Sequence, residues 1–171
     1  MQRYQKAVNA LLGEWLKCTP EQRVYEPDEG GWSMAQLFSH LIDVEVLATE
    51  SMRARLASGK IKQQAWKHKR RYFLLVMGLL IPKRYKVPTQ VAATAQNAQP
   101  HLIAERWKQH QVELNALISE LTHNQQQHLV FMHPIAGPLT ANQALGFMYF
   151  HLLHHLRQLD RIQRSRSYPR S

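Results

Sequence analysis

The sequence predicts an all-α protein folded as a bundle of long helices. Four segments carry apolar residues at the spacing of amphipathic helices that share a core: 3–18, 33–58, 100–121 and 141–164. No segment shows sustained alternation of apolar and polar residues, so no sheet is expected. A further helix is predicted over residues 63–80, and we therefore expect a four-helix bundle with one extra, inserted helix.

Local signals mark where two of these helices begin. Ser33 is followed three residues later by Gln36, and Thr140 is followed by Gln143. Both pairs are capping boxes, in which each side chain hydrogen-bonds the backbone N–H of the other residue. The second and last helices are therefore predicted to start directly after Ser33 and Thr140.

The length of 171 residues suits one domain, spanning 1–171. Residues 83–100 and 122–139 are expected to be loops, and the tail 165–171 is expected to be frayed. The formal net charge is +10. A single cysteine, Cys18, excludes an internal disulfide and suits a reducing compartment. Because no secretory signal is visible either, we expect a cytoplasmic protein.

The longest apolar run, residues 72–82, reads YFLLVMGLLIP. It has about half of the roughly 20 residues that a membrane-spanning helix needs, so we expect a buried helix. Basic residues on both sides leave a second interpretation open, a patch on an anionic membrane surface. These residues are Lys67, Lys69, Arg70, Arg71, Lys83, Arg84 and Lys86.

Histidines interrupt the apolar faces of two predicted helices. His151 and His155 are four residues apart, about 40° around the helix, so they lie one turn above the other with Gln158 nearby. His40 lies in the apolar stripe of the second helix. If the stripes face each other, three imidazoles could hold a divalent metal and leave positions open for water or substrate. Zinc is the first choice, and nickel, iron or manganese also suit imidazole ligands.

Other interpretations of the histidines stay open. The same three residues could be polar core residues without a metal, or part of a closed structural site completed by His133 or Asp43. The following histidines are taken mostly as surface residues: His68, His101, His110, His123, His128 and His154. Asp43 and Glu45 are interpreted as groups behind the ligands or on the surface, and Cys18 as an inert thiol.

Two blocks resemble the DinB-like (YfiT-like) superfamily. They are GGWSMAQLFSHLIDVE, with its His-Leu-x-Asp-x-Glu segment, and HPIAGPLTANQALGFMYFHLLHHLRQL, with its His-x-x-His-His-x-x-Gln segment. The resemblance implies a four-helix bundle of the DinB/YfiT-like type, with a metal on His40, His151 and His155, and a homodimer. It implies either a metal-dependent hydrolase or a transferase that uses a low-molecular-weight thiol as co-substrate, acting on a small molecule.

A function of another class is also open. Basic segments at 67–71, 83–86 and 161–170, with tyrosines among them, could grip the phosphates and stack on the bases of a nucleic acid. No nucleic-acid-binding motif accompanies this charge, so a solvated positive face is the simpler interpretation. The alternative function is thus a non-catalytic bundle that binds nucleic acid or a partner through its basic face.

Overall fold

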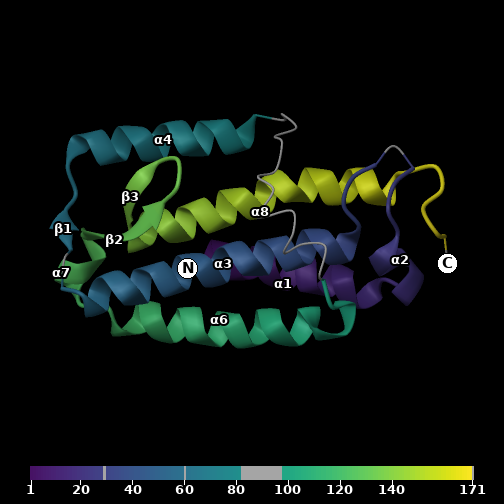
Figure 1. The fold of residues 1–171 in the computed structure, drawn as a ribbon, viewed down its shortest axis with the longest axis horizontal. Helices are drawn as coiled ribbons and strands as arrows, with labels where there is room; N and C mark the ends of the chain where they lie inside the picture. Colours follow the sequence, from purple (N-terminus) through teal and green to yellow (C-terminus); the bar gives the residue numbers. More distant parts are fainter. Residues whose placement is uncertain (29, 60, 82–97, 171) are drawn as a thin grey trace.

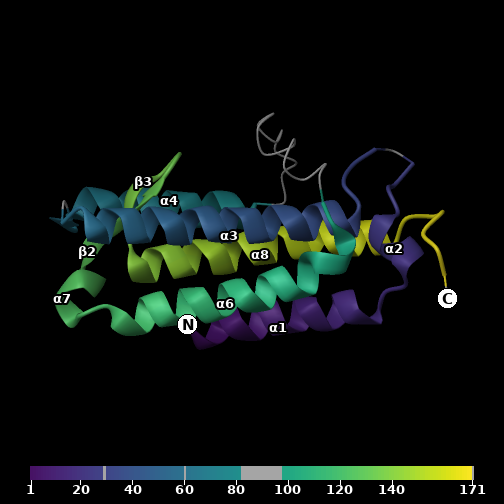
Figure 2. The same cartoon turned by 60° about the horizontal axis from the view of Figure 1, so that its bottom comes forward.

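The structure, a computed structural model, is a four-helix bundle with one helix added to its side, as the sequence predicts. It describes residues 1–28, 30–59, 61–81 and 98–170. The bundle consists of α1 (Gln2–Lys17), α3 (Met34–Ala57), α6 (Ile103–Glu120) and α8 (Ala141–Gln163). These four helices run side by side along the long axis of the molecule (Figures 1 and 2). The added helix, α4 (Trp66–Leu80), packs against α8.

The two predicted capping boxes fix the starts of α3 and α8. Ser33 and Gln36 exchange hydrogen bonds of 2.8 and 3.3 Å between side chain and backbone. Thr140 and Gln143 do the same at 3.1 and 3.3 Å. Because each box satisfies backbone N–H groups that a helix start leaves free, the two helices begin where the sequence predicts.

Large aromatic side chains fill the interior between α1, α3 and α6. The ring of Phe38 on α3 lies 5.3 Å from Trp15 on α1 and 5.4 Å from Trp107 on α6, centroid to centroid. All three side chains are buried. This core holds α3 at the centre of the bundle, with α6 on one side and α8 on another.

A small antiparallel sheet contradicts the prediction that 122–139 is a loop and that the chain has no sheet. Its strands are β1 (Lys62–Gln63), β2 (His128–His133) and β3 (Gly137–Thr140), in the order β1-β2-β3. Short helices also occur at α2 (Pro20–Val24), η1 (Pro100–Leu102) and α7 (His123–Gln126). The sheet was missed because three consecutive β2 residues, 129–131, are buried, which hides the alternation expected of a strand.

Helix α4 also departs from expectation. It begins at Trp66 rather than residue 63, because Lys62 and Gln63 pair with β2. The apolar run predicted to be buried lies partly in water, since Phe73, Leu74 and Met77 are exposed. The predicted loop 83–100 and the end of the apolar run lie mostly outside the described residues. Among the described residues, no helix combines the length and apolar composition needed to cross a membrane.

The tail, expected from the sequence to be frayed, makes specific contacts with the N-terminal part of the chain. Tyr25, after α2, hydrogen-bonds the hydroxyls of Ser165 and Ser167. Gln22 donates to the carbonyl oxygen of Pro169 at 2.9 Å. Tyr168 packs edge-on against Tyr25, with ring centroids 5.4 Å apart. Residues 165–170 thus lie against the turn that leaves α2.

Candidate metal centre

Helices α3 and α8 bring three histidines together inside the bundle. His40 comes from α3, and His151 and His155 come from successive turns of α8. One nitrogen from each ring lies within 4.8 Å of the other two, which makes these residues the group with metal-ligand geometry among the residues described. The ring of His40 lies 5.2 Å from that of His151 and 5.0 Å from that of His155. The convergence expected from the sequence therefore occurs.

The hydrogen bonds of His155 decide which of its nitrogens faces the other histidines. Its Nδ1 lies 3.0 Å from the amide oxygen of Gln158, which can only accept, so the single proton of a neutral ring resides on Nδ1. The Nε2 atom then carries a lone pair, and it lies 3.1 Å from Nε2 of His151. Two nitrogens on one tetrahedral zinc ion, each about 2.0–2.1 Å from it, stand roughly 3.3 Å apart. The spacing of the pair fits shared coordination.

All three rings favour the neutral form that a metal ligand requires. Burial lowers the pKa of His40 to about 4, against a small opposing effect of Asp43. Burial, together with repulsion from His40, lowers the pKa of His155 to about 3. The pKa of His151 lies well below its usual value, because of burial and then of the neighbouring imidazoles. In addition, Nδ1 of His40 is buried without a hydrogen-bond partner among the described residues.

Aromatic side chains surround the three histidines. The ring centroid of Trp32, in the loop before α3, lies 5.0 Å from that of His40. Phe147, one turn before His151 on α8, stacks on it with ring centroids 5.4 Å apart. These apolar walls account for the low pKa values, since they remove water from the rings. The sequence placed Phe147 on the helix face of His151 and His155 but gave neither Phe147 nor Trp32 a role at this site, although both lie within the blocks that resemble the superfamily.

The other candidate ligands are held elsewhere. Nδ1 of His133 accepts hydrogen bonds from the backbone of Ile135 and Ala136, both at 3.1 Å, and its ring packs on Phe147. Asp43 pairs with Arg106 on α6 at 2.9 Å. Neither belongs to the converging group. The structure thus gives no support to a closed site completed by His133 or Asp43.

Several histidines assigned to the surface have structural positions instead. His68 and His110 are buried, which corrects the sequence-based expectation. His68 accepts the backbone N–H of Ala65 and so caps the start of α4. His154 donates from Nδ1 to the carbonyl oxygen of Leu79 at the end of α4, 3.0 Å away. Although His154 is next to His155 in the sequence, its hydrogen bond helps to hold the end of α4 against α8.

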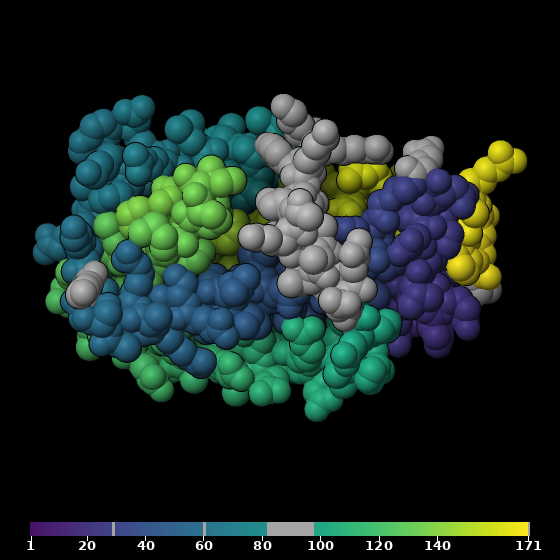
Figure 3. All heavy atoms as spheres, viewed as in Figure 1, coloured from purple at the N-terminus to yellow at the C-terminus, as the bar shows by residue number. Residues whose placement is uncertain are grey.

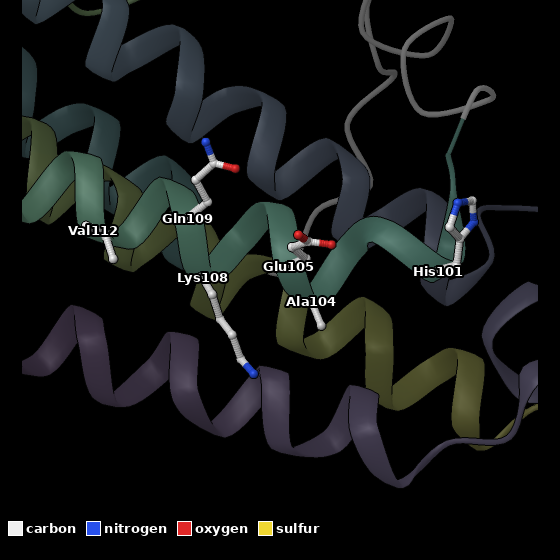
Figure 4. Close-up of a pocket in the computed structure, with 6 residues that line it drawn as sticks. All are labelled: His101, Ala104, Glu105, Lys108, Gln109 and Val112. Atoms are coloured by element: carbon white, nitrogen blue, oxygen red, sulfur yellow. The ribbon is translucent and has the colours of Figure 1, made fainter.

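A concave region away from the three histidines lies along η1 and α6 (Figure 4). It is lined by His101, Ala104, Glu105, Lys108, Gln109 and Val112. Its side chains spread along η1 and α6 and do not converge on a point, so it lacks the geometry of a metal site. Cys18 does not belong to the group of three histidines either; its sulfur lies 3.9 Å from the hydroxyl of Tyr168.

Comparison with known proteins supports the relationship that the two sequence blocks indicate. The model of the DinB superfamily matches residues 2–159, which is nearly the whole chain. The chain belongs to the DinB superfamily. A search of curated protein sequences gives no match.

One solved structure resembles this DinB-superfamily chain over most of its length. It is YfiT from Bacillus subtilis, described as a probable metal-dependent hydrolase with an unusual four-helix bundle topology. The two chains share 20% sequence identity, with a TM-score of 0.57, and the match covers 98% of this chain and 86% of YfiT. At this identity the likeness establishes the fold, and the bundle of α1, α3, α6 and α8 is the shared architecture.

Proposed function

We propose that this protein binds one divalent transition metal through His40, His151 and His155, and that the metal supports hydrolysis or thiol transfer. The observation that carries the proposal is the convergence of three neutral imidazoles in an apolar interior, with the Nε2 lone pair of His155 facing His151. Among the nitrogens of these rings, Nδ1 of His40 is buried without a hydrogen-bond partner in the described part of the chain, which is costly for a buried polar atom. The description of YfiT as a metal-dependent hydrolase agrees with this function.

Zinc is the first candidate for the metal. Imidazole nitrogens suit Zn²⁺, and three protein ligands are typical of zinc sites that keep a position for substrate. Nickel, iron and manganese also bind imidazole, so the metal supplied by the cell contributes to the choice. When bound, such an ion supplies Lewis acidity, which polarises a substrate group and lowers the pKa of an attacking nucleophile.

The residues around the site hold and shield the ligands. Gln158 fixes the tautomer and the orientation of His155 by accepting its Nδ1 proton. Phe147 and Trp32 keep water from His151 and His40. Cys18 contacts Tyr168 rather than these histidines, so the sulfur for thiol transfer would come from a co-substrate. In hydrolysis, water would take the place of that thiol.

The test is elemental analysis of the purified protein after incubation with zinc and removal of unbound metal. We expect roughly one equivalent of metal in the wild type and its loss in His40→Ala and in His151→Ala. His101→Ala, which removes an exposed histidine of η1, is the matched control and should keep the metal. Circular dichroism checks that each variant is folded. A folded wild type that takes up no metal, or a His151→Ala protein that retains it, would contradict the assignment.

Turnover of ester substrates by the metal-loaded protein separates the two chemistries. Reaction in water alone supports a hydrolase. Reaction that requires an added low-molecular-weight thiol, and that forms a product carrying the thiol, supports a transferase.

A further inference from the structure

Helix α4 presents an apolar stripe to the outside of the molecule. Six large apolar side chains on this stripe have exposed fractions between 38% and 67%. They are Trp66, Phe73, Leu74, Met77, Leu80 and Ile81. Trp66, Phe73 and Met77 follow one another at spacings of seven and four residues, which places them along one face of the helix, and Ile81 is the residue that caps its C-terminal end. A continuous apolar surface of this kind marks an interaction site more often than chance exposure.

The opposite face of α4 is fixed to α8, so the stripe has a defined direction. The hydroxyl of Tyr72 lies against Gly146 of α8, where a larger residue would overlap it. At the other end of the helix, Arg157 donates to the carbonyl oxygen of Leu80 at 2.8 Å, beside the bond from His154 to Leu79. Figures 1 and 3 show α4 at the edge of the molecule, with α8 and β3 on its inner side. The apolar stripe therefore faces away from the bundle.

The charges on α4 have one sign. The helix contains Lys67, Lys69, Arg70 and Arg71 and neither Asp nor Glu. All four basic side chains are exposed. The guanidinium of Arg70 lies over the ring of Trp66, 5.1 Å from its centroid, so a positive charge stands within the stripe itself. The first half of the stripe is thus basic and aromatic, and the second half is aliphatic.

We propose that α4 is a membrane-surface helix, which lies flat on an anionic lipid bilayer with this stripe in the headgroup region. Apolar and aromatic residues flanked by Lys and Arg are the pattern of helices that bind this way. Tryptophan and arginine suit the interface, because each joins an apolar body to a polar group that stays among the headgroups. A second copy of the chain would instead bring another basic α4, whereas anionic lipid supplies the complementary charge. The net charge of +10 favours the same partner.

Sedimentation with lipid vesicles tests the proposal on the full chain. We expect binding to vesicles of phosphatidylcholine mixed with phosphatidylglycerol, and little binding to phosphatidylcholine alone. Lys69→Gln with Arg70→Gln should lower the partition coefficient about 25-fold, since each basic residue near the surface contributes about fivefold. Phe73→Gln with Leu74→Gln should lower it by at least about tenfold, because apolar insertion is lost.

A matched control uses equally exposed aliphatic residues on other helices. Phe73 and Leu74 are 62% and 63% exposed, and Leu47 on α3 and Val112 on α6 are 63% and 70% exposed. The Leu47→Gln, Val112→Gln protein should bind vesicles like the wild type. Trp66 supplies a second readout, because it is 67% exposed, whereas Trp15 and Trp107 are buried and Trp32 is partly buried. Its fluorescence should shift to the blue with anionic vesicles.

Two results would overturn the proposal. One is the absence of binding to anionic vesicles; if the wild type is then a dimer that dissociates in the Phe73→Gln, Leu74→Gln variant, the stripe is a contact between two copies. The other is an equal loss of binding in the Leu47→Gln, Val112→Gln control.

Discussion

Helix α3 carries two buried polar sites that differ in how their atoms are paired. His40 faces α8 and the other two histidines. Glu45, five residues later and about 140° around the helix, faces α1 and α6. Both side chains are nearly inaccessible to water. The three histidines fit a cation, whereas Glu45 belongs to a network of hydrogen bonds that joins α1, α3 and α6.

Glu45 lies among hydrogen-bond donors. Its Oε2 accepts from the indole N–H of Trp107 at 2.8 Å and from the amide of Gln111 at 3.2 Å. The same amide donates to the hydroxyl of Tyr4 at 2.8 Å. Burial raises the pKa of Glu45 to about 8, although its hydrogen bonds to Tyr4 and Trp107 oppose the rise. At neutral pH the carboxyl is therefore mostly protonated. Its Oε1, like Oε1 of Gln111, is buried without a hydrogen-bond partner among the described residues.

The neighbouring His110 is also uncharged. Its Nε2 lies 4.0 Å from Oε2 of Glu45, which would suggest an ion pair by distance alone. Burial, however, lowers the pKa of His110 to about 4. With Glu45 mostly protonated and His110 neutral at pH 7, the contact joins two neutral groups. The Glu45 network thus avoids buried charge, whereas the three histidines present lone pairs that only a proton donor or a cation can satisfy.

Among the variants discussed, Glu45→Ala is expected to have the largest effect, which is a loss of stability of the folded protein. This change leaves the indole N–H of Trp107 without its acceptor, removes one of the two acceptors of the Gln111 amide, and opens a cavity between three helices. Together these losses should lower the free energy of unfolding by about 3–5 kcal/mol, measured by urea unfolding. Glu50→Ala, at an exposed position of α3, should change it by less than about 0.5 kcal/mol. A loss below about 1 kcal/mol in Glu45→Ala would show that this network does not stabilise the bundle.

The contrast between the two sites also explains what the sequence could predict. The histidine centre is signalled locally, since His151 and His155 are one turn apart and His40 interrupts an apolar stripe. The starts of α3 and α8 are likewise signalled within four residues by their capping boxes. Such patterns are predictable because they depend on helix geometry alone.

The remaining features depend on contacts between distant segments. Glu45 was interpreted as a group behind the ligands or on the surface, because its donor Trp107 is 62 positions away in the sequence. The strand β2 was missed because its pairing with β1 and β3 and its packing on α3 define it, rather than any alternation. The apolar run of α4 was expected to be buried, but the docking of one face on α8 leaves the other face outside. Tertiary packing overrides local pattern in all three cases.

A smaller effect is expected from Gln158→Ala, which tests whether the histidine centre depends on a supporting hydrogen bond. Loss of the acceptor frees His155 to rotate and to change its tautomer. Metal affinity should fall by about 10–100-fold, measured by competition with a chelator, while the helix content stays unchanged. Gln163→Ala, another partly buried glutamine of α8, is the control and should bind metal like the wild type. Equal affinities in the two variants would mean that Gln158 does not position His155.

The smallest effect is expected in the pH dependence of the metal-free protein, where the two sites act in opposite directions. The pKa of Glu45 is raised from 4.5 to about 8, so the folded state binds the extra proton between these values. Its contribution to stability is present at low pH and is lost as pH rises toward 8. The pKa values of His40 and His155 are lowered from 6.5, so their contribution is lost as pH falls below 6.5.

About one pH unit above 6.5 the histidines are mostly neutral in both states, and Glu45 alone among these groups sets the slope. The free energy of unfolding should then fall by up to about 1.4 kcal/mol per pH unit as the pH rises from about 7.5 toward 8, measured by urea unfolding at each pH. Glu45→Gln, which keeps the shape but cannot ionise, should remove this slope and leave the decline below pH 6.5 intact. If wild type and variant had the same slope, Glu45 would be ionised in the folded protein, and both polar sites of α3 would need a cation.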